Sequence, residues 1–185
     1  INSGFQGNWH FVGYDPIMEA TMFNHLLVPL DGSPLAEAAL PAAMELASKF
    51  NSKITLVWVI QPPHLIMTAA NGSVYAQLLT EMRHQSEQDA QSYLRSHQGS
   101  LRQQGYDVQA IVTEGENIAD ALLDAAATRD VDTIVMSTHG RGGLSRWVFG
   151  SVADKVLRQA EVPVLLIRAK EETTDWKLRE TETAV

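Results

Sequence analysis

Short apolar runs alternate with longer helical patterns along the chain, and this alternation predicts a parallel sheet covered by helices. We expect strands over His25–Leu30, Ile54–Ile60, Asp107–Thr113, Thr133–Ser137 and Val162–Ile167. All but the third run are nearly continuous in apolar residues, which is typical of strands buried on both faces of a sheet.

Helical periodicity and helix-boundary residues fill the gaps between these runs. We expect helices over residues 33–49, 74–104, 118–128 and 151–160. The third and fourth follow the third and fourth strands, so every parallel connection contains a helix.

Several helix boundaries carry their own signals. Ser33 is a predicted N-cap with Pro34 at the first helical position. Pro41 lacks an N–H and should kink the first helix. Ser151 and Asp154 have the spacing of a capping box, with aspartate in place of glutamate.

Five strands joined by right-handed crossovers predict a single-domain α/β fold, a doubly wound parallel sheet of order 3-2-1-4-5 with helices on both faces. The strand order reverses between the first and fourth strands. Ligands of such sheets bind beyond the carboxyl ends of the strands at that reversal. The loops there are residues 30–33, "LDGS", and residues 137–143, "STHGRGG".

The pattern also divides the chain of 185 residues. Residues 1–21 lack the basic and apolar regions of a signal peptide, and we treat them as an N-terminal extension, either natural or introduced by cloning. Residues 22–169 form the expected domain, and residues 170–185 are a charged tail.

Composition narrows the classes of function. The formal net charge of −8 argues against a nucleic-acid binder and against docking on anionic membranes. The absence of cysteine excludes disulfides and thiolate metal sites and suits the cytoplasm. No apolar run approaches the ~20 residues needed to span a bilayer.

The stretch "STHGRGGLSRWVFGSV", residues 137–152, has the residue types of an anion site. Gly140, Gly142 and Gly143 let the backbone turn its N–H groups toward an anion. Gly150 and Ser151 open a helix, whose first N–H groups attract phosphate. Arg141 can pair with outer phosphates.

Three common templates do not match this stretch: the P-loop, the dinucleotide fingerprint and the nucleophile elbow. The spacing instead resembles the G-x2-G-x9-G-[S/T] motif of the universal stress protein family, nucleotide-binding branch. The resemblance covers about residues 22–169 and includes "HLLVPLDGSPLAEAAL", "LVWVI", "THGRGGLSRWVFGSVADKVL" and "VPVLLIR". One residue departs from the motif, because Ser137 stands at the first glycine. Serine is tolerated there unless that position needs positive φ or close ribose approach.

The resemblance implies that the chain binds ATP or AMP, with Mg²⁺ held through the phosphates. Adenine would lie beside the end of the first strand and beside the second. Ribose and phosphates would lie along the motif. The residues expected to contact the nucleotide are Pro29, Leu30, Asp31, Val59, Met136, Ser137, His139, Gly140, Arg141, Gly142, Gly143, Gly150, Ser151 and Val152.

Two of these residues have a purely structural alternative. Asp31 either contacts the ligand, directly or through a metal ion, or ends the first strand and helps to cap the first helix. Ser151 taken alone is more often a helix cap than a ligand contact.

We expect a regulatory binding protein rather than an enzyme, because the loop has no lysine and no evident carboxylate to position water for phosphoryl transfer. The alternatives are a nucleotide-independent interaction or chaperone-like module, and a slow ATPase. The protein partner stays unidentified. The apolar Val162–Ile167 is an edge strand in the expected order, and we predict that it pairs across a two-fold axis in a homodimer, as the resemblance also implies.

Overall fold

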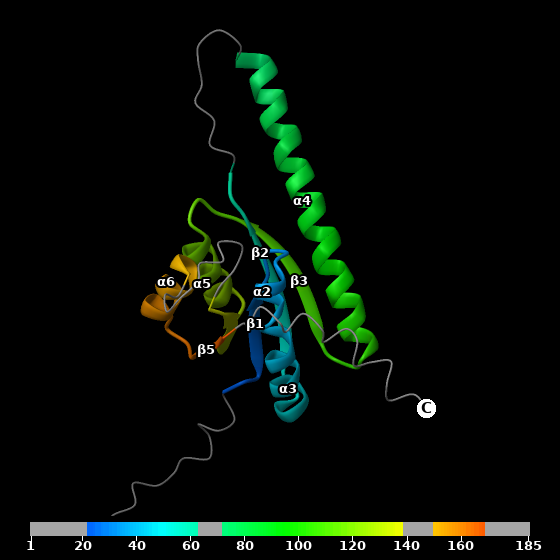
Figure 1. The fold of residues 1–185 in the computed structure, drawn as a ribbon, viewed down its shortest axis with the longest axis vertical. Helices are drawn as coiled ribbons and strands as arrows, with labels where there is room; N and C mark the ends of the chain where they lie inside the picture. The colour runs from blue at the N-terminus through cyan, green and yellow to red at the C-terminus, as the bar shows by residue number, and fades with distance from the viewer. Residues whose placement is uncertain (1–21, 63–71, 139–149, 169–185) are drawn as a thin grey trace, which may run out of the picture.

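A parallel sheet with helices on both faces makes up the body of the molecule (Figure 1). The computed structural model describes residues 22–62, 72–138 and 150–168. In chain order its elements are β1 (His25–Pro29), α2 (Pro34–Glu37), α3 (Leu40–Phe50), β2 (Lys53–Ile60), α4 (Gly72–Gln103), β3 (Val108–Glu114), α5 (Ile118–Thr128), β4 (Thr133–Ser137), α6 (Ser151–Gln159) and β5 (Val164–Ile167).

The five strands lie in the order β3-β2-β1-β4-β5, and every neighbouring pair is parallel. The predicted fold class and strand order are therefore confirmed. β1 occupies the centre, and the chain winds outward from it first through β2 and β3 and then through β4 and β5.

Side chains of β1 alternate between two hydrophobic cores. Leu26 and Val28 pack on one face with α2, α3 and α4. Leu27, between them, packs on the other face with residues of α5 and α6. Figure 1 shows α5 and α6 on one side of the sheet and α4 on the other. Burial on both faces explains the continuous apolar run, because neither set of alternate side chains meets water.

The predicted first helix is two helices. Ser33 caps α2 as expected, its hydroxyl accepting from the Ala36 N–H at 3.1 Å, with Pro34 in the first turn. The helix then breaks, and Pro41 lies in the first turn of α3. A proline in a helix interior removes a hydrogen bond and clashes with the preceding turn, whereas in a first turn it costs little. The expected kink is thus a complete break.

The last strand begins later than predicted. β5 starts at Val164, whereas the predicted strand starts at Val162. Pro163 therefore lies just before the strand, and the prediction that it lies within the strand was wrong. The Pro163 carbonyl still accepts from the Ile134 N–H at 2.9 Å. Proline can extend the ladder as an acceptor but cannot donate to it.

α4 is the longest helix in the described chain, and its second half packs on β2 and β3. It ends shortly before Gly105, whose φ of +92° is a conformation that favours glycine. Among the described helices, α4 included, none combines the length and apolar character needed to cross a bilayer.

A chain of polar contacts ties the strands together near their amino ends. Gln109 of β3 donates to the Thr55 hydroxyl at 2.9 Å, and that oxygen lies 2.7 Å from Nε2 of His25. Backbone carbonyls of Arg129 and Asp130 accept from the His25 ring. A neutral imidazole whose other nitrogen donates to these carbonyls can accept at Nε2 from the Thr55 hydroxyl, while a lone pair of the Thr55 oxygen accepts from Gln109.

Burial, followed by the nearby Lys53, lowers the pKa of His25 below its usual 6.5, although Asp132 and the backbone carbonyls act in the opposite direction. The folded chain therefore takes up this proton at a lower pH than the unfolded chain does. His25 costs no stability above pH 6.5, and stability falls as the pH decreases from there toward the folded pKa.

We predict that His25→Gln reduces the loss of stability between about pH 7.5 and 5.5, because glutamine cannot take up the proton. The measurement is the urea midpoint of unfolding at both pH values. His84→Gln, at an exposed position of α4, is the control and should keep the wild-type dependence. An unchanged pH dependence in the His25 variant would contradict the prediction.

Candidate functional site

β1 and β4 separate before they reach their carboxyl ends. They pair through Leu26–Thr133 and Leu27–Ile134, whereas β1 stays paired with β2 as far as Pro29–Val57. The helices that follow β1 and β4 lie on opposite faces of the sheet, and no strand pairing in the described chain joins these two ends. Doubly wound sheets bind ligands in a crevice outside the carboxyl ends of the strands at such a reversal. We call the region between the end of β1 and the end of β4 the crevice.

The loop after β1 forms one side of this crevice. Pro29 is half-buried, and Leu30 is buried with its N–H donated to the Val57 carbonyl at 2.9 Å. Asp31 Oδ1 accepts from the backbone N–H of Ser33 at 2.9 Å and from its hydroxyl at 2.6 Å. Asp31 therefore supports the cap of α2, which is the structural role considered for it above. It also lies directly after β1, beside the crevice.

The end of β4 forms the other side. Met136 and Ser137 are buried, and Ser137 lies in regular strand structure paired with Ile167. Among described residues other than glycine, positive φ occurs only at Phe23, Asn51 and Asp130. Ser137 thus needs no glycine-like backbone conformation, and the departure from the motif costs no strain in this fold.

Both ends of the predicted anion loop meet. The N–H of Gly150 donates to the carbonyl of Thr138, the residue after β4, at 2.9 Å. Eleven positions separate these residues in the sequence, yet this bond holds the start of α6 against the end of β4. The chain that leaves β4 at Thr138 therefore returns to the same residue at Gly150.

α6 begins at Ser151 with Gly150 as its N-cap, and no side chain caps it. The predicted capping box is wrong, because Ser151 is already in the first turn and Asp154 instead binds Arg158 at 3.0 Å. The first backbone bond of the helix runs from the Asp154 N–H to the Gly150 carbonyl. The N–H groups of Ser151, Val152 and Ala153 consequently have no acceptor among the described residues, which is the arrangement that binds anions at helix starts.

Three predicted residues belong to one hydrophobic core. Val59 of β2, Met136 of β4 and Val152 of α6 all belong to the hydrophobic cluster beneath α5 and α6. Ser151, next to Val152, is exposed. The other predicted residues, His139, Gly140, Arg141, Gly142 and Gly143, lie outside the described residues.

A polar cluster that sequence reasoning missed connects this region to α4. Glu37 of α2 accepts from the Tyr93 hydroxyl at 2.8 Å, and His97 Nε2 lies 3.4 Å from the same oxygen. Burial, then the bond and charge of Glu37 and the charge of Asp31, raise the pKa of Tyr93 well above its usual range. The available signal was the i, i+4 spacing of Tyr93 and His97, which places both rings on one helix face.

No group of three or more histidine or acidic side chains in the described parts of the chain is arranged to hold a metal ion. A Mg²⁺ ion carried by phosphate oxygens would not need such a group, because Mg²⁺ usually keeps several waters and one or two carboxylates beside a nucleotide.

Comparison with known proteins gives consistent results. The sequence profile of the universal stress protein family matches residues 22–168. Universal stress protein YxiE of Bacillus subtilis is 29% identical over 149 residues, which are 80% of this chain and all of that protein.

Solved structures agree on the fold. The structure of hypothetical protein MJ0577, from Methanocaldococcus jannaschii, superimposes with a TM-score of 0.69 at 23% identity, over 80% of this chain and 98% of that one. A universal stress protein of Archaeoglobus fulgidus, in complex with dAMP, gives a TM-score of 0.56 at 20% identity, over 80% of this chain and 98% of that one. With most of its length matched by the family profile, this chain belongs to the universal stress protein family.

Proposed function

We propose that the chain binds an adenine nucleotide, ATP or AMP, in the crevice between β1 and β4, and that it acts as a homodimeric regulatory protein in the stress response. The observation that carries this proposal is the bond between Thr138 and Gly150, which fixes the uncapped start of α6 at the sheet reversal. The dAMP complex of the Archaeoglobus protein supports an adenine nucleotide as the ligand class.

The described residues offer a separate type of contact for each part of a nucleotide. The N–H groups at the start of α6 suit phosphate oxygens, since the unpaired donors and the helix dipole both favour negative charge. In this proposal the base, which has two apolar faces, lies beside Val59, Met136 and Val152, at the margin of the hydrophobic core to which they belong. Asp31 is an acceptor for an amine or hydroxyl of the ligand. In this proposal Mg²⁺ binds through the phosphates, and His139, Gly140, Arg141, Gly142 and Gly143 complete the anion site.

Binding rather than fast hydrolysis follows from the same residues. Phosphoryl transfer needs a clamp of positive charge and a group that orients the attacking water. The described rim offers backbone N–H groups and one carboxylate, Asp31, which Ser33 already engages. Bound nucleotide would therefore act by changing the conformation or the partners of the protein.

We predict that Ser151→Pro weakens ATP binding by about tenfold or more, because it removes one N–H and one hydroxyl from the phosphate site. The helix should persist, since proline is favoured at the first helical position and Gly150, at φ −57° and ψ 149°, has the backbone that precedes proline. Isothermal titration with ATP and Mg²⁺ gives the affinity.

Ser151→Ala is the matched control, which removes the hydroxyl alone and should lose less affinity. Adenosine, which has no phosphates, should bind the wild type and Ser151→Pro equally. Absence of ATP binding by the wild type would refute the function, and equal ATP affinity in wild type and Ser151→Pro would refute the position of the phosphates.

The homodimer of this proposal forms through β5. This strand is the sheet edge beyond β4, and Leu165 on it is 38% exposed. An apolar edge strand readily pairs with another strand, and two identical edges can pair across a two-fold axis.

We predict that the wild type has a dimer mass in light scattering at micromolar concentration and that Leu165→Lys is a monomer, because lysine on an edge strand blocks pairing. Leu157→Lys is the control, since Leu157 is also an exposed leucine, 44% exposed, but lies on α6. A monomeric wild type, or a Leu165→Lys variant that stays dimeric, would contradict the interface.

A further inference from the structure

The outer side of β3 carries backbone groups that no strand pairs in the described chain. Backbone groups of successive residues point to opposite sides of a strand. The Asp107 carbonyl accepts from Ile54 and the Gly115 N–H donates to Ile60, so odd-numbered residues of β3 face β2. Ala110, Val112 and Glu114 therefore direct their N–H and C=O groups outward.

α4 contacts this edge at its beginning through hydrogen bonds and at its end through the ion pair between Arg83 and Glu114. Side chains of Gln98 and Arg102 donate to the Val108 carbonyl at 3.0 and 2.9 Å. Among the residues that the structure describes, no comparable contact reaches the outward groups of Ala110 or Val112. The β3 sequence "VQAIVTE" also contains neither lysine nor proline, the residues that commonly protect edge strands from pairing.

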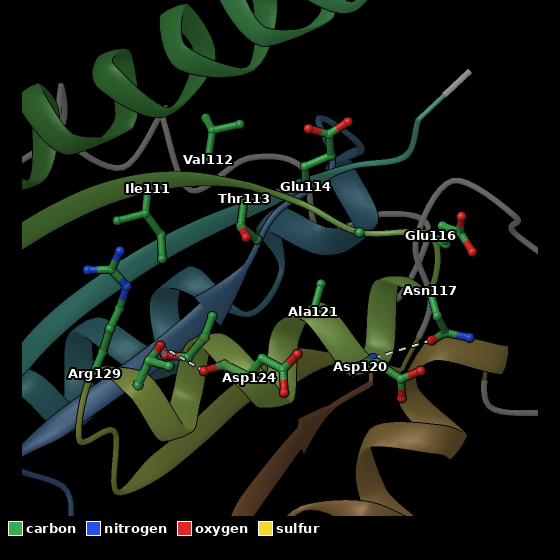
Figure 2. Close-up of a pocket in the computed structure, with 13 residues that line it drawn as sticks. Ile111, Val112, Thr113, Glu114, Glu116, Asn117, Asp120, Ala121, Asp124 and Arg129 are labelled. Carbon is green, nitrogen blue, oxygen red and sulfur yellow. Dashed lines mark hydrogen bonds between the residues drawn. The ribbon is translucent and has the colours of Figure 1, made fainter. Parts of the chain in front are cut away.

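A groove of about 540 Å³ runs between β3 and α5. Figure 2 shows Ile111 and Thr113 pointing from β3 toward α5, while Val112 and Glu114 point to the opposite side. Ala121 and Ala125 form the helical wall, and their short side chains leave room beside Ile111. The groove thus has an apolar floor directly beside an open strand edge.

The rim of this groove is acidic. Three carboxylates lie along it, Glu116, Asp120 and Asp124, against one cation, Arg129, while the Glu114 side chain points to the opposite side of the strand. Figure 2 shows Arg129 at the end opposite Glu116 and Asp120. Exposed ion pairs join Glu114 to Arg83 and Asp120 to Lys155, whereas the exposed side chains of Glu116 and Asp124 have no partner among the described residues. An acidic partner, including a second copy of this chain at net charge −8, is disfavoured here.

We propose that β3 and the groove beside it bind an extended, basic peptide segment of a partner protein as a sixth strand of the sheet. The open backbone groups of Ala110, Val112 and Glu114 supply the hydrogen bonds. Alternate side chains of the added strand enter the groove, where a lysine stem packs on Ile111 and its ammonium reaches the carboxylates. This site lies at the opposite edge of the sheet from β5 and does not depend on the nucleotide.

The probe is a fluorescein-labelled peptide of nine residues that alternates lysine and valine, and fluorescence anisotropy gives its affinity. Glu116→Lys combined with Asp124→Lys should weaken binding about tenfold or more, because two attractive charges become repulsive. The matched control is Glu45→Lys with Glu161→Lys, which changes the net charge equally at exposed positions on other elements and should bind as the wild type does. A peptide with glutamate in place of lysine should not bind.

Amide hydrogen exchange, followed by NMR, tests the strand pairing itself. The peptide should slow the exchange of the N–H groups of Ala110, Val112 and Glu114. Absence of binding, equal loss in the control, or binding without this protection would overturn the proposal. A change in oligomeric mass on reversing Glu116 and Asp124 would also overturn it, since the edge would then pair copies of the chain.

Discussion

The central position of β1 is the constraint on which the other features of this chain depend. β1 has β2 on one side and β4 on the other, so the chain runs outward from β1 to β2 and β3 and then crosses back past β1 to β4 and β5. Right-handed crossovers in opposite directions place their helices on opposite faces. The two cores follow from this, and so does the early separation of β1 from β4 after Leu27 and Ile134. The reversal at which doubly wound sheets bind ligands is therefore a consequence of strand order.

A single backbone hydrogen bond then places the start of α6 at this reversal. The contact between Gly150 and Thr138 joins the end of β4 to the start of α6. Glycine at the N-cap contributes no side-chain acceptor, so the first turn of α6 keeps its donors. Had Ser151 been the cap, its oxygen would have satisfied one of them. The one-residue difference between the expected and observed cap thus leaves the first N–H groups of the helix open, as the proposed anion site requires.

Strands buried on both faces were predicted well from the sequence, because a continuous apolar run is a strong local signal. The bounds of β4 and α5 agree with the prediction, and the strand order followed from handedness alone. Errors occurred where a single residue has two uses. Pro41 could kink one helix or start another, and Ser151 could cap a helix or lie inside it; the choice depends on the path of the neighbouring chain.

Contacts between distant segments left less trace in the sequence. Glu37, Tyr93 and His97 come from two helices that meet only in the folded chain, and only the spacing within α4 hinted at them. The acidic groove also depends on tertiary packing, although β3 and α5 are adjacent in the sequence. It exists because α5 packs over β1 and β2 and leaves the outer strand β3 partly uncovered. Such features require the three-dimensional packing.

The two edges of the sheet differ in the kind of partner that each can accept. β5 exposes Leu165 and offers an apolar surface, which is compatible with an identical copy of itself. β3 has carboxylates along its groove, and two copies brought together there would place like charges face to face. Because the edges are separated by the full width of the sheet, one can join copies while the other stays accessible. The nucleotide site that we propose lies between the two edges, at β1 and β4. β2 separates it from β3, whereas β4 pairs directly with β5. A bound nucleotide that shifts β4 or α6 would therefore act first on the β5 edge, and so on assembly, before it affected a peptide at β3.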